Sequence, residues 1–153
     1  MIFVTHSLPV NEPGNPEVTR EALWEGLVAK ANNALPFVAV MTHCEVTQRH
    51  SDTVFDREVE VHGDRLTERI TLEEPDRVIF TRLSGPVLGT ITNEIEEQDG
   101  ALGLRFSFAL AVRGVPGGSP EEHGHADRMA VDYRKAVEST LSAIRKVAAG
   151  ATV

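Results

Sequence analysis

The chain has 153 residues, enough for one domain to bury roughly 68–70% of the surface that its unfolded form exposes. Acidic residues outnumber basic ones, 23 to 15, and the formal charge of -8 at pH 7 argues against a nucleic-acid partner. The single cysteine, Cys44, excludes an intramolecular disulfide, and neither a secretory leader nor a membrane span is recognisable, so we expect one cytoplasmic domain over residues 1–153.

The N-terminal part of the chain predicts one strand and one short helix. Residues 2–10 alternate between apolar and polar side chains, as in a half-buried strand. Thr19 suits a helix N-cap, and apolar residues then recur at helical spacing. These residues are Leu23, Trp24, Leu27, Val28 and Ala31. Asn32 and Asn33 suit the C-terminal end of this helix, and Pro36 limits any second helix to a single short turn.

The middle of the chain has a period of two and predicts six strands. The segments are 42–48, 53–61, 65–73, 77–83, 87–97 and 102–112. Short polar and glycine-containing stretches separate them, which is typical of an antiparallel meander. The last segment shows the alternation most clearly. On one of its faces lie Leu102, Leu104, Phe106, Phe108, Leu110 and Val112.

The C-terminal part predicts a long amphipathic helix that stops near Gly150. Ser119, Pro120 and Glu122 form a possible capping box, although Gly124 would cost about 1 kcal/mol and could delay the start to around Ala126. The apolar stripe contains Met129, Tyr133, Ala136, Val137, Thr140, Leu141, Ile144 and Val147. This helix is the only element large enough to cover the apolar face of the sheet.

These elements predict an α+β fold with a seven-stranded curved antiparallel sheet around the long helix, in the order β-α-α-β6-α. The short first helix is left to close one end of the sheet, with its Trp24 face against the sheet or the long helix. A curled sheet around a single helix leaves space that the helix does not fill. We therefore expect an internal pocket that suits an apolar molecule.

Two segments carry a resemblance to a known family. They are TREALWEGLVAKANNALPFV near the N-terminus and DYRKAVESTLSAIRKVAAG at the end, with the meander between them. Together they resemble the AtaL-like family of the SRPBCC superfamily, which includes the START and birch-pollen-allergen helix-grip domains. The resemblance covers nearly the whole chain and implies a helix-grip fold with a hydrophobic pocket between sheet and long helix. It brings no catalytic motif.

One hairpin places two opposite charges on an apolar face. If His62 and Gly63 form its loop, Arg57 lies opposite Glu68, and both point to the same side as Val59 and Leu66. A buried ion pair is rarely a net stabiliser, which makes Arg57 and Glu68 candidate ligand anchors. The structural alternative is that the arginine extends to the sheet edge and the glutamate lies at the rim.

Other candidates lie on the apolar faces. Candidate pocket walls are Val59, Leu66, Ile91, Phe106 and Phe108. His6 lies between Val4 and Leu8, and it is either a base that works near neutral pH or a core histidine with a satisfied ring. Asn93 offers a donor and an acceptor to a ligand, or is an ordinary satisfied polar residue. Tyr133 points its hydroxyl into a cavity, or packs in the core.

Metal and cofactor signatures are missing. The segment EEHGHAD brings His123 and His125 close to three carboxylates, but its H-x-H spacing matches no common zinc pattern, so a solvated polar loop is the better interpretation. The chain has no G-x-G-x-x-G, P-loop, G-x-S-x-G or H-E-x-x-H motif. We expect no metal and no cofactor.

The sequence therefore favours a protein that binds a small, largely hydrophobic molecule and is not an enzyme. The alternative, implied by cyclase and dehydratase members of the superfamily, is acid-base chemistry on a polyketide-like or aromatic substrate, with Glu68 or His6 as base and Arg57 stabilising an enolate. A third class, a protein-interaction module, would expose a large apolar patch instead of a closed pocket. The sequence leaves the ligand and the oligomeric state open.

Overall fold

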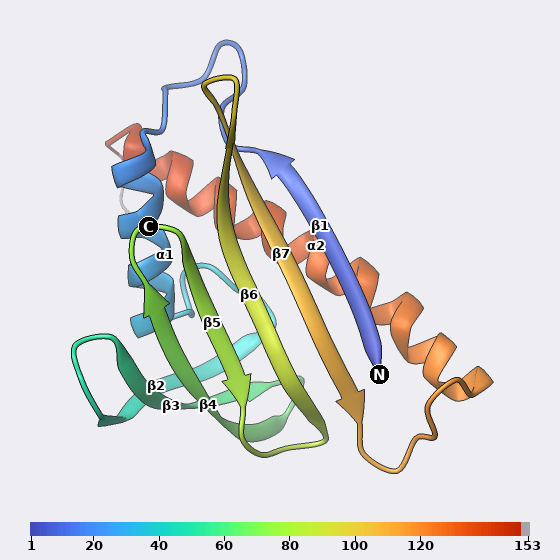
Figure 1. The fold of residues 1–153 in the computed structure, drawn as a ribbon. Helices are drawn as coiled ribbons and strands as arrows, with labels where there is room; N and C mark the ends of the chain where they lie inside the picture. Colours follow the sequence, from blue (N-terminus) through green and yellow to red (C-terminus); the bar gives the residue numbers. More distant parts are fainter. Residues whose placement is uncertain (151–153) are drawn as a thin grey trace.

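Residues 1–150 of the protein are described by a computed structural model, and residues 151–153, the end of the predicted domain, lie outside the described residues. The described part contains a seven-stranded antiparallel sheet, a short helix and a long helix (Figure 1). In chain order the elements are β1 (Ile2–Pro9), α1 (Arg20–Asn32), β2 (Met41–Arg49), β3 (Val54–Val61), β4 (Asp64–Glu73), β5 (Arg77–Arg82), β6 (Val87–Gln98), β7 (Ala101–Val112) and α2 (Pro120–Ala148). The predicted helix-grip fold is confirmed.

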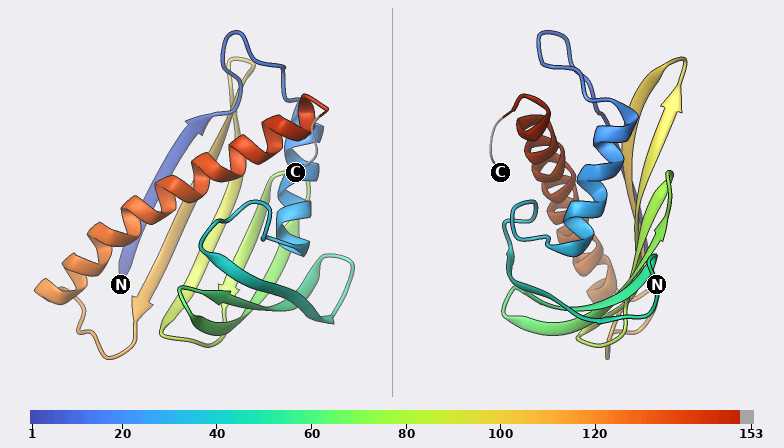
Figure 2. Two further views of the ribbon diagram at one scale, coloured as in Figure 1. Left: turned by 180° about the vertical axis from the view of Figure 1, so that it is seen from behind. Right: turned by 90° about the vertical axis from the view of Figure 1, so that its left-hand side faces the viewer.

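The sheet has the order β1-β7-β6-β5-β4-β3-β2, so the six meander strands lie in sequence order and β1 pairs with β7. The β3–β4 hairpin turns at His62 and Gly63, which both have positive φ, as a tight two-residue turn requires. This turn pairs Arg57 with Glu68, as predicted from the sequence. Both helices lie on the same side of the sheet, and β2, β3 and β4 curl beneath them (Figure 2).

Helix α1 begins and ends where its sequence predicts. The hydroxyl of Thr19 accepts a hydrogen bond from the backbone N–H of Ala22 at 3.1 Å, and Asn33 is the C-cap. The second short helix of the predicted order is absent from the described residues. Residues 35–37 form only a turn, because Pro36 disfavours helical geometry at the residue before it.

Helix α2 begins at Pro120 and not around Ala126, the later start that Gly124 had suggested. The hydroxyl of Ser119 accepts from the N–H of Glu122 at 3.2 Å. The carboxylate of Glu122 in turn accepts from the N–H of Gly118 and from the amino group of Met1. These contacts offset the cost of Gly124 in the first turns. With 29 residues the helix is about 44 Å long, and it crosses the sheet diagonally (Figure 2).

The core lies between the concave face of the sheet and the two helices. Its most buried side chains from the sheet include Phe55, Ile70, Val78, Leu104 and Leu110. Helix α1 contacts β5, β6 and α2, and its Trp24 is buried in this core, so the short helix closes one end of the sheet as predicted. Neither described helix has an apolar stretch long enough to cross a membrane.

The two helices approach each other closely at Gly26. A methyl group on this residue would lie 2.6 Å from Cγ1 and 2.8 Å from Cδ1 of Ile144, which is itself 3% exposed. Gly124, in α2, has no such neighbour, since its nearest contact would be Nη1 of Arg128 at 3.5 Å. The same substitution therefore clashes with a buried side chain at one site and makes an ordinary contact with an exposed side chain at the other.

We expect Gly26→Ala to lower the free energy of unfolding by about 1–3 kcal/mol, because Ile144 has to leave its packed position. Gly124→Ala should instead raise it by about 0.5–1 kcal/mol, since alanine is the better helix former. Urea denaturation of both variants measures the difference. A Gly26→Ala protein at least as stable as the Gly124→Ala protein would contradict the close approach of the two helices.

Candidate functional site

A cavity of about 440 Å³ lies between the sheet and the first half of α2. Apolar side chains make up most of its lining, including Leu66, Phe80, Val87, Ile91, Phe106 and Leu110 from the sheet. The α2 side is formed by Met129, Tyr133 and Ala136, among others. The volume is within the range of about 300–1,000 Å³ that is usual for small-molecule sites.

The inner end of the cavity holds the predicted ion pair. Oε1 of Glu68 accepts hydrogen bonds from Nε of Arg57 at 3.1 Å and from Nη2 at 2.9 Å. The two side chains are 3% and 4% exposed, so the arginine does not reach the sheet edge and the glutamate does not lie at the rim. The expected solvent-exposed alternative is wrong. Both charges are buried, and both line the cavity.

Arg57 also has a structural role that the sequence did not suggest. Its Nη1 donates to the backbone carbonyl oxygens of Lys30 and Ala31, each at 2.9 Å. These carbonyls belong to the last turn of α1, where the helix itself provides no partner for them. Arg57 therefore ties the end of α1 to β3, and most of its hydrogen-bonding capacity is used within the protein.

Lys30 is the second buried cation at the inner end. Its Nζ donates to Oδ1 of Asn93 at 2.7 Å and lies 5.1 Å and 4.4 Å from the ring centroids of Phe80 and Phe106. Burial, and to a lesser extent the Arg57 guanidinium, lower the pKa of Lys30 from its ordinary 10.5 to about 7, while Glu68 opposes this shift. The amine is therefore divided between charged and neutral forms near neutral pH.

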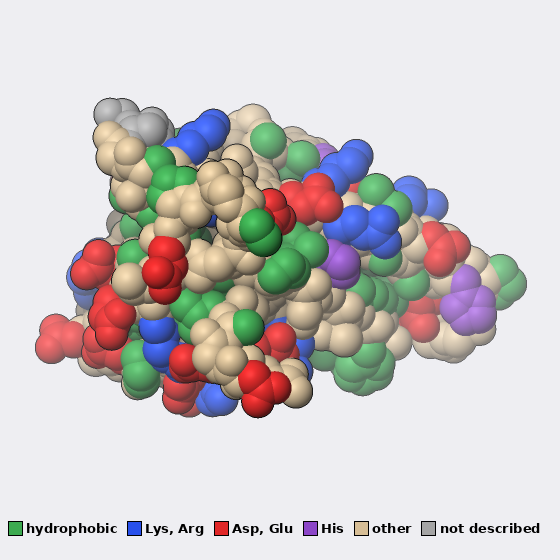
Figure 3. Space-filling model, turned by 90° about the horizontal axis from the view of Figure 1, so that it is seen from above, with side chains coloured by type: hydrophobic (Ala, Val, Ile, Leu, Met, Phe, Trp, Pro, Cys, Tyr) green, Lys and Arg blue, Asp and Glu red, His purple; other side chains and the backbone are tan. Residues whose placement is uncertain are grey.

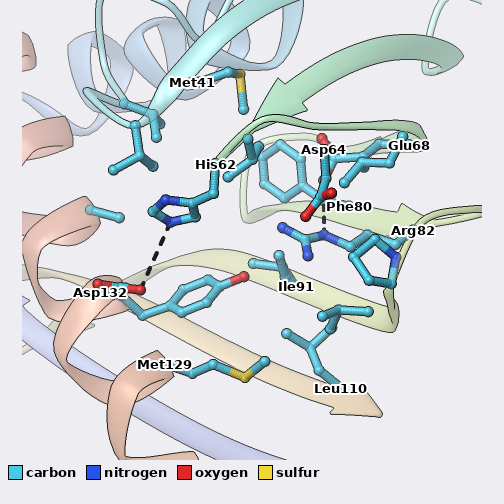
Figure 4. Close-up of a pocket in the computed structure, with 18 of the residues that line it drawn as sticks. Met41, His62, Asp64, Glu68, Phe80, Arg82, Ile91, Leu110, Met129 and Asp132 are labelled. Carbon is cyan, nitrogen blue, oxygen red and sulfur yellow. Dashed lines mark ion pairs between the residues drawn. The ribbon is translucent and has the colours of Figure 1, made fainter. Parts of the chain in front are cut away.

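Two more polar groups lie near Glu68. Nε of Arg82 is 3.7 Å from Oε2 of Glu68, beyond hydrogen-bond distance, and it has no hydrogen-bond partner among residues 1–150 (Figure 4). Burial raises the pKa of Tyr133 to about 12, so its hydroxyl stays protonated and able to donate. The inner end thus combines three basic groups with one carboxylate, and it favours a ligand with an electron-rich oxygen.

The mouth of the cavity is more exposed and carries charges of both signs. Nε2 of His62, in the β3–β4 turn, lies 3.9 Å from Oδ2 of Asp132 on α2, and the two side chains face each other across the opening (Figure 4). Met41 and Met129 also line the cavity, on opposite sides of the view in Figure 4. The surface seen in Figure 3 has acidic and basic side chains interspersed with hydrophobic ones. His62 and Asp132 thus lie at the opening of a mainly apolar cavity.

The structure places six of the ten predicted site residues in the cavity lining. These are Arg57, Glu68, Leu66, Ile91, Phe106 and Tyr133. They come from β3, β4, β6, β7 and α2, and the curl of the sheet brings them together.

The other four do not line the cavity. Val59 is fully buried, and the ring of Phe108 packs against Tyr133 with 4.2 Å between centroids. Asn93 is fully buried and reaches the site only through Lys30, while its Nδ2 has no partner among the described residues. His6 lies on the edge strand β1 opposite Phe106 and is not among the lining residues. Its Nε2 is buried without a hydrogen-bond partner among the described residues, so the alternative of a core histidine with a satisfied ring is wrong for this nitrogen.

The histidine-rich segment after β7 is helical and not a loop. Residues 121–127 form the first turns of α2, which the Ser119 cap starts early. His125 from this segment lines the cavity mouth. Within residues 1–150 no group of three or more metal-ligating side chains is close enough to hold an ion.

Sequence reasoning missed Lys30 and Arg82, although a signal existed for both. Lys30 lies three residues after Leu27 and seven after Leu23, which places it within the apolar stripe of α1. Arg82 continues the inward alternation of Val78 and Phe80 on β5. A charged residue at an inward position of an apolar pattern is the feature that would have identified them.

Residues 4–150 match the profile of the AtaL family, described as acetylaranotin biosynthesis cluster protein L. No curated protein sequence matches the chain. Among solved structures, an uncharacterised protein from Bacillus thuringiensis has a TM-score of 0.67 at 15% identity, over 93% of this chain and 98% of that one. The Zhui aromatase/cyclase from Streptomyces sp. R1128 has a TM-score of 0.66 at 17% identity, over 98% of both chains. Ara h 8.0201 has a TM-score of 0.62 at 12% identity, over 97% of both. At these identities the likeness supports the fold.

Proposed function

The chain belongs to the AtaL family of the SRPBCC superfamily, and on that premise we propose that it binds a small, largely hydrophobic molecule in the cavity between the curved sheet and α2. The observation that carries the proposal is the cavity itself, which combines apolar walls with buried basic groups at its inner end. A protein-interaction module would need an exposed apolar patch. The apolar side chains that line the cavity face inward instead, and this favours small-molecule binding over a protein-interaction module.

The expected ligand has an apolar body and an oxygen-bearing end. Phe80, Ile91, Phe106 and Leu110 provide the walls for the body. Nε of Arg82 is buried without a hydrogen-bond partner among the described residues, so an enol, carbonyl or carboxylate oxygen placed there would satisfy it. Since Glu68 already compensates Arg57, the surplus of positive charge comes from Arg82 and Lys30.

We propose further that residues 1–153 act as a single domain in the cytoplasm. The free thiol of Cys44 is compatible with a reducing environment. The described elements share one core, which supports a single unit.

Filling the cavity should weaken binding of an apolar probe. Ala136 lies on the cavity side of α2, whereas Ser142, on the same helix, is exposed. We expect Ala136→Trp to weaken binding of 1-anilinonaphthalene-8-sulfonate by at least about tenfold, because the indole occupies the space of the naphthalene rings. Fluorescence titration measures the affinity, and a thermal shift confirms binding to the native state.

The matched control is Ser142→Trp, which adds the same side chain outside the cavity. Its affinity for the probe should stay within about twofold of the parent protein. Equal loss of affinity in both variants, or in neither, with the fold preserved by circular dichroism, would refute the cavity as the binding site.

The second candidate function is a cyclase- or dehydratase-like enzyme that acts on a polyketide-like or aromatic substrate. The observation in its favour is the acid-base equipment of the inner end, where Glu68, Arg82 and Tyr133 lie near one another. The roles differ from those expected from the sequence. His6 lies outside the cavity lining, and Arg57 is occupied by the end of α1, which leaves Arg82 as the better group to stabilise an enolate.

A further inference from the structure

The amino group of Lys30 is buried at the inner end of the cavity and oriented by a single hydrogen bond. It extends from the last turn of α1 to the inner end of the cavity and lines it, yet the residue is only 6% exposed. Oδ1 of Asn93 accepts one of its hydrogens at 2.7 Å and orients the group. The rings of Phe80 and Phe106, whose centroids lie 5.1 Å and 4.4 Å from Nζ, offer it no lone pair.

The charges around Lys30 come from three strands. Arg57 on β3 repels a proton on the amine, Glu68 on β4 attracts one, and Arg82 on β5 is held near Glu68. An ammonium group has three hydrogens to donate, and the described residues provide one acceptor for them. Desolvation and the like charge of Arg57 together favour the neutral amine, whose lone pair is free to react.

We infer that Lys30 is a carbonyl-reactive residue, and that the ligand of this cavity carries a ketone or aldehyde that condenses with its amino group. The inference rests on the proposed binding function and names the chemical class of the ligand. The lone pair of Nζ attacks the carbonyl carbon and forms a C–N bond, giving a carbinolamine. A proton moves from nitrogen to oxygen, water leaves, and an imine remains. The step needs no oxidant or reductant.

The surroundings favour one kind of carbonyl compound. A protonated imine would carry a positive charge beside Arg57, in a site that already disfavours the charged amine. A 1,3-dicarbonyl compound avoids this, because its imine tautomerises to a neutral, conjugated enaminone. The second oxygen of the adduct is then available to accept from a donor such as Nε of Arg82, which lacks a hydrogen-bond partner within residues 1–150. We therefore expect 1,3-dicarbonyl compounds to react best.

The chain carries its own controls for this reaction. Its three lysines are Lys30, Lys135 and Lys146, and the last two are exposed on α2. The probe is benzoylacetone, an aromatic 1,3-diketone, incubated with the whole protein at pH 7.5. The adduct adds the mass of the probe minus one water and absorbs in the near ultraviolet, and peptide mapping locates it.

We expect one adduct per chain, with Lys30 modified at least about tenfold faster than Lys135 or Lys146, because at neutral pH the neutral fraction of an exposed lysine is far smaller. Lys30→Arg and Lys30→Met should abolish the rapid adduct, and Lys135→Arg should leave it unchanged. Adducts spread evenly over the lysines and the N-terminal amine, or no adduct, would overturn the inference.

The binding assay separates this failure from that of the proposed function. If 1-anilinonaphthalene-8-sulfonate binds and Ala136→Trp blocks it, the cavity binds small molecules, and a missing Lys30 adduct refutes only the carbonyl chemistry. If the fluorescent probe also fails to bind in the cavity, both proposals are wrong.

Discussion

Replacing Lys30 with methionine should stabilise the protein at pH 6 by about 1–3 kcal/mol. The folded state lowers the pKa of this amine from 10.5 to about 7, which corresponds to a burial cost on the order of 4–5 kcal/mol when the group is charged. Methionine has a similar shape and no charge. The gain is smaller than the full cost, because the buried Oδ1 of Asn93 loses the hydrogen bond that Lys30 donates to it, at about 1–3 kcal/mol.

The effect of Lys30 should depend on pH in a defined direction. Between about pH 7 and 10.5 the unfolded chain binds a proton at this residue that the folded protein has released, so the stability of the parent protein rises with pH. Below pH 7 the cost is fully present, and above about 10.5 it is gone. The advantage of Lys30→Met should therefore shrink steadily from pH 7 upward.

Urea denaturation of the parent and Lys30→Met proteins at pH 6 and pH 10 tests this expectation. Lys135→Met is the matched control, because this lysine lies on the exposed face of α2 and should show little change at either pH. A stability difference between Lys30→Met and the parent that stays constant with pH would contradict a buried, perturbed amine. A stabilised variant that loses its adduct would show that Lys30 is retained at the expense of stability.

Replacing Arg57 with leucine should have the opposite effect and destabilise the protein by about 3–5 kcal/mol. The substitution removes the two hydrogen bonds that Arg57 donates to the buried carboxylate of Glu68, and Arg82, 3.7 Å away, is too distant to replace them. It also removes the two hydrogen bonds to the carbonyl oxygens of Lys30 and Ala31 at the end of α1. The loss should appear as a lower thermal midpoint and a lower denaturation midpoint in urea.

Replacing both Arg57 and Glu68 should destabilise the protein less than replacing Arg57 alone. We expect Arg57→Leu combined with Glu68→Leu to regain part of the lost stability, because no uncompensated carboxylate remains in the interior. Arg65→Leu is the exposed control. It removes two ion pairs of the same hairpin, to Glu58 and Glu60, and should change stability little, since water screens them. Equal effects of Arg57→Leu and Arg65→Leu would contradict the structural role of Arg57.

These two predictions assign different functions to neighbouring cations. Arg57 holds α1 against the sheet, and its substitution should act first on stability. Lys30 lowers the stability of the folded protein, and its substitution should act first on the reaction with carbonyl compounds. The two side chains lie within 5.2 Å of the same Phe80 ring centroid, so they share one environment. They differ in their hydrogen bonds, since Arg57 donates to Glu68 and two backbone carbonyls, whereas Lys30 donates only to Asn93 among the described residues. Stability and reactivity measured on the same variants therefore separate the two roles.

The sequence by itself determined the seven strands, the places of the two helices and one pairing inside the site. Alternation with period two placed all seven strands, because a half-buried strand needs one apolar and one polar face. The His62-Gly63 turn set the hairpin register, and with it the contact of Arg57 with Glu68, since both depend on neighbours close in the chain. Thr19 marked the start of α1 for the same local reason, whereas for α2 the sequence left open the Ser119 cap and a later start around Ala126.

Only the tertiary structure decided what surrounds each charged side chain. Arg57 caps a helix that ends 25 residues before it, and Asn93 meets Lys30 across 63 positions of sequence. His6 faces inward as its pattern predicts, yet it lies on the edge strand β1 and does not line the cavity. Hydrogen-bond partners and desolvation depend on groups brought together by the curl of the sheet and the angle of the helices. The period of a local pattern carries no information about that geometry, because it records which face a residue is on and not what the face meets.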